Sequence, residues 1–409
     1  MYGPESDFLF ACATHLSRNR KQTSPCSSSS FFLRPIPLCD FLTMEKPKTG
    51  RISQHGGRPM HRSIVATLLG LSLLLPVTSQ AQTYDQKEFN VVGTFNFLTN
   101  YPQLEKPFFT EVLPQLSGGK LTANMKANNE LNLKGPEMLR LLKQGVFDFV
   151  FAIPIFVEDG GAVIEAIDIA GVSRNFQMAR DITELWMPEM QKVMKDKHNA
   201  LIIGTNTYPE QGLYCRGDVK SVEDVKGKKV RVQGTSQSEL ISAFGGTGVT
   251  IMFGEVVPAL EKGVVDCGIT GTMPAYKAKW TEVTNSVLRL PLGYTTGFLA
   301  VNLTMWNKLS PDTRKLIQTE SDKLTDRSWK LIESETEDGI RCTTGTGNCP
   351  VGAPGKLKLN LPSEADYKAR DKALNDHVLK SWAKRCGADC AAKWTEVIGT
   401  KYGLVAKAD

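Results

Sequence analysis

One segment, from Val230 to Thr270, constrains the fold of this chain more than any other part. Its pattern predicts a strand, a glycine-rich turn, two helices and a second strand, over Val230–Val232, Gly234–Ser236, Leu240–Phe244, Glu255–Lys262 and Gly263–Asp266. Arg231 stands at the carboxyl end of the first strand, just before a helix start. Ligands of open α/β sheets bind at that edge, and free amides at a helix start favour an anion. The segment therefore predicts a small-anion site, although a surface arginine paired with an acid would leave the same pattern.

Strands and helices alternate through the rest of the chain, which is typical of an α/β fold with largely parallel sheets. Further elements are predicted over Phe89–Thr94, Pro107–Leu116, Lys120–Met125, Glu137–Gln144, Val146–Ile153, Gln177–Lys195, Leu201–Gly204, Gly212–Cys215, Phe298–Asn302 and Pro311–Glu335. The apolar run Val146–Ile153 is expected of a strand that is buried on both faces. Ser310 caps the last helix, which is expected to be the longest in the chain.

A short internal repeat indicates two similar lobes. Leu142–Asp148 (LKQGVFD) matches Leu260–Asp266 (LEKGVVD), 118 residues later. Each copy ends a predicted helix at a glycine that can take the left-handed capping conformation, and then begins a strand. So short a match also arises by coincidence, but the order strand, helix, glycine, strand recurs around both copies. We expect one lobe over 82–212 plus 298–334, a second over 213–297 plus 335–409 with the C-terminal helices, a ligand cleft between them, and a long helix bracing both.

Residues 60–81 have the three parts of a secretory signal peptide. His61 and Arg62 precede the apolar run Ile64–Val77, and Ser79–Ala81 forms a small-residue site, so cleavage is expected after Ala81. The run is shorter than the roughly 20 residues that span a bilayer. Residues 1–59 show no periodic apolar pattern. We hypothesise that translation starts at Met60, the alternative being a disordered extension, and we expect an exported protein.

Composition narrows the function further. The full chain has a formal net charge of +6, whereas residues 82–409 carry 40 Lys/Arg and 39 Asp/Glu, so the basic excess lies mainly in the leader. No basic stripe remains, and no nucleic-acid partner is expected. The chain lacks a Gly-x-Ser-x-Gly elbow, a His-Glu-x-x-His pair and a Walker loop. His198 and His377 lie in polar helical surroundings. These features indicate no enzyme, no metal and no cofactor.

Six cysteines follow the leader, which agrees with export. Cys342 and Cys349 flank a polar, glycine-rich loop and are expected to form a disulfide. Cys386 and Cys390 either bridge one turn or pair with the first two, while a four-sulfur zinc site is a weaker alternative because the spacings are wide. Cys215 and Cys267 are either buried thiols or a bridge between neighbouring strands.

Several motifs are more specific than this general pattern. They are Lys226–Val232 (KGKKVRV), Phe253–Asp266 (FGEVVPALEKGVVD), Gly119–Leu121 (GKL), Met138–Asp148 and Lys308–Pro311 (KLSP). Together they resemble the solute-binding proteins of tripartite ATP-independent periplasmic (TRAP) transporters, the DctP-like family, over residues 88–335 and more loosely beyond. The resemblance implies a type II periplasmic-binding-protein fold and a protein that works in the periplasm. We expect a monomer that closes over an organic acid and delivers it to a membrane permease.

The resemblance also implies roles for particular residues. An arginine at the position of Arg231 grips the ligand carboxylate, an aromatic at Phe253 lines the pocket, and a polar residue at Thr270 hydrogen-bonds the ligand. The family's second arginine is replaced here by Gln211, with Arg216 a few residues on. Where some members carry an acid after the buried strand, this chain has Ile153.

Thr94, at the end of the first predicted strand, and Tyr294 complete the candidate ligand contacts. With Met252 and Met273 nearby in sequence, the pocket is expected to be more apolar than one for a sugar acid or small dicarboxylate. An aromatic or branched monocarboxylate is therefore an open alternative to a dicarboxylate. Two other functions remain: a sensor subunit with the same fold, and a secreted α/β enzyme acting on an organic acid.

Overall fold

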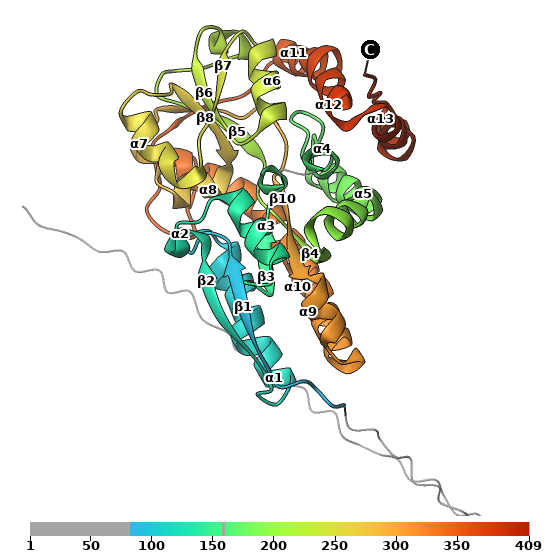
Figure 1. The fold of residues 1–409 in the computed structure, drawn as a ribbon. Helices are drawn as coiled ribbons and strands as arrows, with labels where there is room; N and C mark the ends of the chain where they lie inside the picture. The colour runs from blue at the N-terminus through green and yellow to red at the C-terminus, as the bar shows by residue number, and fades with distance from the viewer. Residues whose placement is uncertain (1–81, 158–159, 409) are drawn as a thin grey trace, which may run out of the picture. The chain divides into compact units, whose positions relative to one another are not determined.

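The computed structural model describes residues 82–157 and 160–408, whose path is shown in Figure 1. All of them belong to one compact unit. The predicted signal peptide over 60–81 and the extension over 1–59 lie outside the described residues. Within the described ranges, none of the helices combines the length and the hydropathy of a membrane span.

The first sheet has five strands in the order β2-β1-β3-β10-β4. They are β1 (Lys87–Gly93), β2 (Leu121–Ala127), β3 (Phe149–Ala152), β4 (Ala200–Thr207) and β10 (Thr296–Asn302). All four residues of β3 are buried, as predicted for a strand covered on both faces. Phe89 packs edge to face on Phe149 with ring centroids 5.0 Å apart, and Phe109 packs on the same ring. We call this sheet and its helices lobe I.

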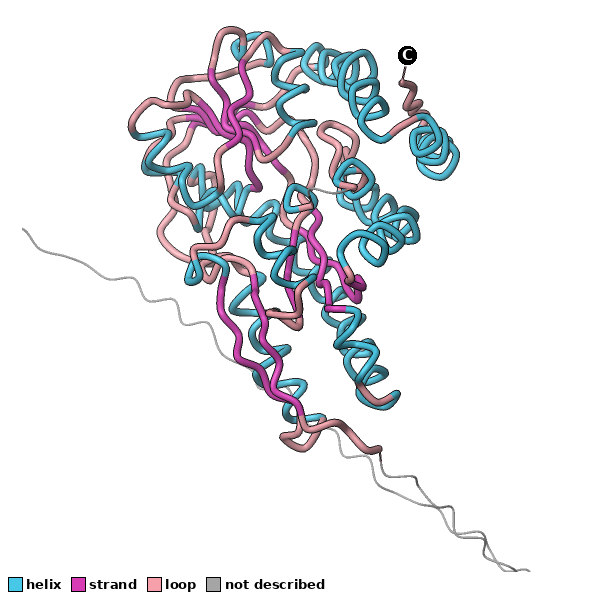
Figure 2. Tube along the Cα trace, in the orientation of Figure 1, coloured by secondary structure: helices cyan, strands magenta, loops and turns pink. Residues whose placement is uncertain are grey.

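The second sheet has six strands in the order β11-β9-β5-β8-β6-β7. They are β5 (Gln211–Cys215), β6 (Lys229–Val232), β7 (Thr247–Thr250), β8 (Cys267–Gly271), β9 (Ser286–Leu288) and β11 (Lys358–Asn360). Val230 and Val232 belong to one apolar core, while Arg231 lies on the opposite face of β6 against Trp280. We call this sheet and its helices lobe II, and Figure 2 shows the strands in two groups flanked by helices.

Both sheets are mixed, which corrects the expectation of largely parallel sheets. β10 runs antiparallel to β3 and β4, and β5 runs antiparallel to β8 and β9. Each of these strands enters its sheet from the other lobe, β5 directly after β4 and β10 directly after β9. The two crossing segments hydrogen-bond to each other, since the Tyr208 amide donates to the Thr295 carbonyl at 2.9 Å and the Gln211 amide to the Gly293 carbonyl at 3.0 Å. The exact lobe boundaries stay a prediction.

Helices surround both sheets. They are α1 (Leu113–Leu116), α2 (Asn128–Leu131), α3 (Gly135–Lys143), α4 (Gly161–Glu165), α5 (Phe176–His198), α6 (Thr235–Ala243), α7 (Val256–Glu261), α8 (Thr272–Lys277), α9 (Leu303–Lys308), α10 (Pro311–Thr344), α11 (Glu364–Ala373), α12 (Leu379–Cys386), α13 (Ala388–Trp394) and α14 (Thr400–Tyr402). Two π-helical turns, Tyr101–Glu105 and Phe108–Val112, precede α1, where the sequence predicts a regular helix from Pro107.

The long helix α10 braces both lobes, as predicted, but it continues to Thr344 rather than ending near Glu335. Its first half bonds β4, where the Ser321 hydroxyl donates to the Ile203 carbonyl at 2.9 Å. Its second half lies against α8, and the Thr272 hydroxyl donates to the Thr336 carbonyl at 2.9 Å. Gly339 permits this approach, because a Cβ there would lie 2.3 Å from the Met273 backbone nitrogen.

The internal repeat has the same local structure in both lobes. Gly145 and Gly263 follow α3 and α7 with φ of +78° and +70°. The carboxylates of Asp148 and Asp266 each accept a 2.8 Å hydrogen bond from a backbone amide at a neighbouring strand. The strands begin only after these aspartates, so the predicted strand starts at Val146 and Gly263 were too early. The valine after each glycine is about half exposed. Its apolar side chain resembles the start of a buried strand in the sequence, and this resemblance led to the early prediction.

The C-terminal helices contact both lobes, and Figure 1 shows α11 and α12 near α6 and α4. The Trp382 indole donates to the Ala162 carbonyl in α4 at 2.8 Å. Ser381 and Arg385 bond Glu239 of α6. These helices therefore form a further connection between the lobes, while their assignment to lobe II stays a prediction.

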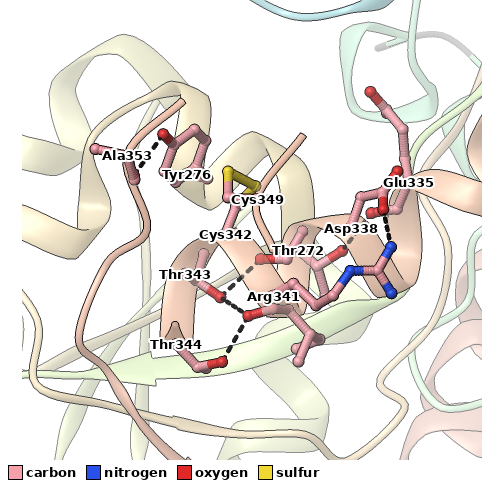
Figure 3. Close-up of a disulfide and its surroundings, with 12 residues drawn as sticks. Thr272, Tyr276, Glu335, Asp338, Arg341, Cys342, Thr343, Thr344, Cys349 and Ala353 are labelled. Carbon is pink, nitrogen blue, oxygen red and sulfur yellow. Dashed lines mark hydrogen bonds and ion pairs between the residues drawn. A yellow bond between two sulfur atoms is a disulfide. The ribbon is translucent and has the colours of Figure 1, made fainter. Parts of the chain in front are cut away.

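The six cysteines of the described residues form three disulfides, Cys215–Cys267, Cys342–Cys349 and Cys386–Cys390. The first joins opposed residues of β5 and β8. In the second, Cys342 lies in the last turns of α10 beside α8, near Tyr276, whose hydroxyl donates to the Ala353 carbonyl at 2.7 Å (Figure 3). The described residues contain no His, Cys, Asp and Glu group suited to a metal ion, and these pairings take the cysteines that the zinc alternative required.

Candidate ligand-binding site

A cleft lies at the carboxyl ends of β1, β3, β6 and β8, so both lobes contribute to it. Its empty volume is about 770 Å³, open solvent included. It is lined by Gly93, Thr94, Phe95, Leu98, Asn128, Met138, Phe151, Ile153, Ile155, Phe156, Tyr208, Arg231, Gln233, Ile251, Met252, Phe253, Thr270, Gly271, Pro274 and Thr295. Most of these side chains are apolar, and Arg231 is the one charged member of the set. The cleft is thus an apolar space with a single cation.

Arg231 is buried, with 2% of its surface exposed. Its Nε donates to the Ile251 carbonyl at 2.9 Å and its Nη1 to the Ile269 carbonyl at 2.8 Å. Within residues 82–157 and 160–408, Nη2 has no hydrogen-bond partner and no carboxylate forms an ion pair with the guanidinium. Burial alone lowers the pKa of Arg231 to about 9. A buried cation held in place by carbonyls but lacking a counter-ion is arranged to receive an anion.

Aromatic rings surround the guanidinium. Its carbon lies 5.7 Å from the ring centroid of Phe253 and 5.8 Å from that of Trp280. Phe253 of lobe II also meets Phe95 of lobe I, with ring centroids 5.6 Å apart in a T-shaped arrangement. Cation–π attraction to Phe253 and Trp280 holds the guanidinium in place, and Phe95 and Phe253 together cover one side of the cleft.

A polar network lies next to Arg231 along the crossing segments. The Thr295 hydroxyl donates to Gln233 Oε1 at 2.8 Å, and both residues line the cleft. Gln211 bonds Thr295 and accepts from Gln237 Nε2 at 2.6 Å. Gln211 is therefore a buried residue behind the cleft wall, where it fixes Thr295, and not itself a lining residue. Thr270 lines the cleft at the end of β8.

On the lobe I side, Thr94 lines the cleft above a buried acid. Its amide and hydroxyl both donate to the Glu105 carboxylate at 2.8 Å. Burial raises the pKa of Glu105 to about 7, although these hydrogen bonds oppose the shift. Burial, with the charge of Glu105 adding to it, also raises the pKa of the neighbouring Tyr208 phenol. This wall of the cleft therefore presents neutral hydroxyl groups and no cation.

The start of α6, where the sequence predicts a small-anion site, is partly occupied by a side chain of the protein itself. The amide of Ser236 donates to Glu165 Oε1 of lobe I at 3.0 Å. The amide of Gln233 is bonded by the Gln237 side chain at 2.8 Å. Arg385 of α12 in turn pairs with Glu165 at 2.8 Å and with Glu239. A carboxylate of the protein occupies the place where a ligand was expected, in a second cavity beside the cleft.

Two other predicted ligand contacts do not reach the cleft. Arg216 is exposed and follows the far end of β5, next to Gly263, because the whole strand separates it from Gln211. Tyr294 is buried against Ala179 and Trp329 in a small core cluster, because its neighbour Thr295 takes the side of the chain that faces the cleft. Met273 is buried beside Cys342 and Cys349.

The structure brings Arg231, Phe253, Thr270, Thr94, Ile153 and Met252 together in the cleft. It adds residues that sequence reasoning missed, chiefly Tyr208, Gln233, Thr295, Phe95 and Ile155. Phe95 and Ile155 follow strand ends, so the rule that ligands bind at carboxyl ends of strands could have found them. Tyr208 and Thr295 lie in the crossing segments, and no local pattern marks them.

Comparison with known proteins places this geometry in a family. Residues 101–344, more than half of the chain, match the model of the bacterial extracellular solute-binding proteins of family 7. The C4-dicarboxylate-binding periplasmic protein DctP of Rhodobacter capsulatus is 23% identical over 302 residues, covering 70% of this chain and 86% of that protein.

Solved structures share the fold. The Bordetella pertussis solute receptor DctP7, which binds pyroglutamic acid, has a TM-score of 0.67 at 17% identity over 76% of this chain and 99% of that one. A TRAP solute-binding protein of Desulfovibrio salexigens with bound orotic acid has a TM-score of 0.68 at 16% identity, covering 77% and 98%. The two-lobed TRAP-type fold is thereby confirmed, and the chain belongs to the bacterial extracellular solute-binding proteins of family 7.

Proposed function

We propose that this protein captures a small organic acid and delivers it to the membrane permease subunits of a TRAP transporter. The observation that carries the proposal is Arg231, a buried cation that lines the cleft and has no ion-pair partner among the described residues. A carboxylate would supply the missing negative charge and accept charge-assisted hydrogen bonds from the guanidinium. The relatives named for binding a C4-dicarboxylate, pyroglutamic acid and orotic acid support the same class of ligand.

In this proposal, three residues divide the work of binding. Arg231 pairs with the carboxylate through Nη2, the group that the two carbonyls leave free. Thr270 donates a hydrogen bond to the ligand, and Phe253 covers its body. A micromolar site needs about 8 kcal/mol. One desolvated arginine–carboxylate pair together with apolar contacts in the cleft accounts for a free energy of that size.

Capture requires that the lobes open and close. The crossing segments between β4 and β5 and between β9 and β10 are the places where rotation is absorbed, with hinge positions near Gly212 and Gly297. A ligand favours closure only through contacts that the open form lacks. Here Arg231 and Phe253 come from lobe II, and Thr94, Phe95 and the Ile153 segment come from lobe I, so a ligand touching both groups favours the closed form.

Export completes the proposal. Residues 60–81 act as a signal peptide that is cleaved after Ala81, and the mature protein works as a monomer in the periplasm. The three disulfides of the described residues fit an oxidising compartment. N-terminal sequencing of the exported protein tests this part, and a mature chain that keeps residues before Gln82 would contradict it.

The ligand-binding proposal is tested in two steps. First, the purified protein is denatured and any released small molecule is identified by mass spectrometry, with an organic acid as the expected result. Second, the released acid is titrated calorimetrically into stripped, refolded protein. The wild type is compared with Arg231→Ala and with the matched control Arg216→Ala. We expect binding to be lost only in Arg231→Ala. Equal affinity in all three proteins would rule out the role of Arg231.

A further inference from the structure

The cleft also points to the kind of acid that it accepts. We infer that it selects a monocarboxylate with a branched or aromatic apolar body over a dicarboxylate. This inference rests on the proposed function, because it assumes that a carboxylate binds Arg231. It concerns the opposite end of the ligand, and the residues there argue for it independently.

First, the cleft offers one cation only. Arg231 is the single Lys or Arg among the lining residues. Arg385 lines an adjoining cavity that shares Ile153, Ile155 and Gln233 with the cleft. Its guanidinium is already paired with Glu165 at 2.8 Å and with Glu239. A second carboxylate on the ligand would therefore find no cation in the cleft, and only neutral polar side chains such as Asn128 and Tyr208 could partner it.

Second, the wall across from lobe II carries an acid. The amide and the hydroxyl of Thr94 both donate hydrogen bonds to Glu105. The Thr94 side chain therefore has no donor left for a ligand anion. The Glu105 carboxylate itself is 1% exposed. A second ligand carboxylate on this side would meet a like charge whenever Glu105 is ionised, and a neutral group would not.

Third, the remaining surface fits an apolar body. Phe253 and Phe95 meet over the cleft with ring centroids 5.6 Å apart, and Ile153, Met252 and Phe156 continue the apolar lining. Transfer of a branched alkyl or phenyl group from water into such a space is favourable, whereas transfer of a carboxylate is not.

The test uses two acids of the same size. 4-Methylpentanoate and succinate have the same number of non-hydrogen atoms and differ in that an isopropyl group replaces the second carboxylate. Calorimetric titration of the stripped, refolded wild-type protein should give an affinity for 4-methylpentanoate that is about tenfold or more above that for succinate. The uncharged 4-methylpentanamide should bind much more weakly than the acid, because Arg231 then lacks its anion. Phe253→Ala, at a partly exposed position, should narrow the preference between the two acids.

The outcomes separate this inference from the proposed function. Equal or tighter binding of succinate overturns the inference, while the protein remains a carboxylate-binding protein. Binding of neither acid, nor of phenylacetate, also overturns it. If galacturonate, pyroglutamate and orotate then fail as well, and the denatured protein releases no organic acid, the proposed function fails too.

Discussion

Arg231→Met gives a prediction in which stability and binding change in opposite directions. Burial of the charge lowers the pKa of Arg231 to about 9, and this shift corresponds to a penalty of roughly 5 kcal/mol for the ionised form at neutral pH. The two carbonyl hydrogen bonds and the two aromatic rings offset part of it, and methionine loses them. We therefore expect the ligand-free variant to be as stable as the wild type, or up to about 2 kcal/mol more stable.

Bound ligand should make the wild type more stable than Arg231→Met. At a ligand concentration of 100 times the dissociation constant, the wild type gains about 2.7 kcal/mol of stability, and a variant that does not bind gains nothing. Urea unfolding followed by tryptophan fluorescence, with and without 4-methylpentanoate or the acid released from the native protein, measures both effects. Arg216→Met, at an exposed arginine outside the cleft, should behave like the wild type. A ligand-free Arg231→Met protein that is several kcal/mol less stable would show that the arginine is a structural residue and would refute the reasoning.

Three further predictions concern the surroundings of the cleft. Burial raises the pKa of Glu105 to about 7, so the folded state holds its proton more tightly than the unfolded state; stability should fall by up to roughly 3 kcal/mol as pH rises from about 4.5 to 7. Glu105→Gln should remove this part of the pH dependence in urea unfolding at pH 5 and pH 8, and parallel curves for the two proteins would contradict it. Gly339→Val should destabilise the fold by more than about 2 kcal/mol, since its Cβ would lie 2.3 Å from the Met273 nitrogen, while Gly217→Ala, with open space around it, should not. Arg385→Met removes the shared ion-pair partner of Glu165 and Glu239. It should reduce the free energy of unfolding by about 1–3 kcal/mol and lower the midpoint of thermal unfolding. An unchanged midpoint would argue against a stabilising role of these ion pairs.

The sequence predicted the parts of the structure that depend on local pattern. The alternation around Arg231 places its side chain away from the core that holds Val230 and Val232. The glycine caps at Gly145 and Gly263 have the expected left-handed conformation. These features depend on a few adjacent residues, so a single sequence contains the information that fixes them.

Features that depend on distant contacts were missed. The start of α6 offers amides, but Glu165, some seventy residues earlier, takes the one at Ser236. The antiparallel strands β5 and β10 arise because each crosses from the other lobe, which no local pattern records. The length of α10 beyond Glu335 depends on its packing against α8 at Gly339, a residue that on its own favours a helix end.

The most direct test of the account is a crystal structure of the protein with the acid that it retains through purification. We expect one ligand carboxylate within hydrogen-bond distance of Arg231 Nη2, with the rest of the ligand between Phe253 of lobe II and the Ile153 segment of lobe I. A ligand held elsewhere, with Arg231 bonded only to the carbonyls of Ile251 and Ile269, would contradict it.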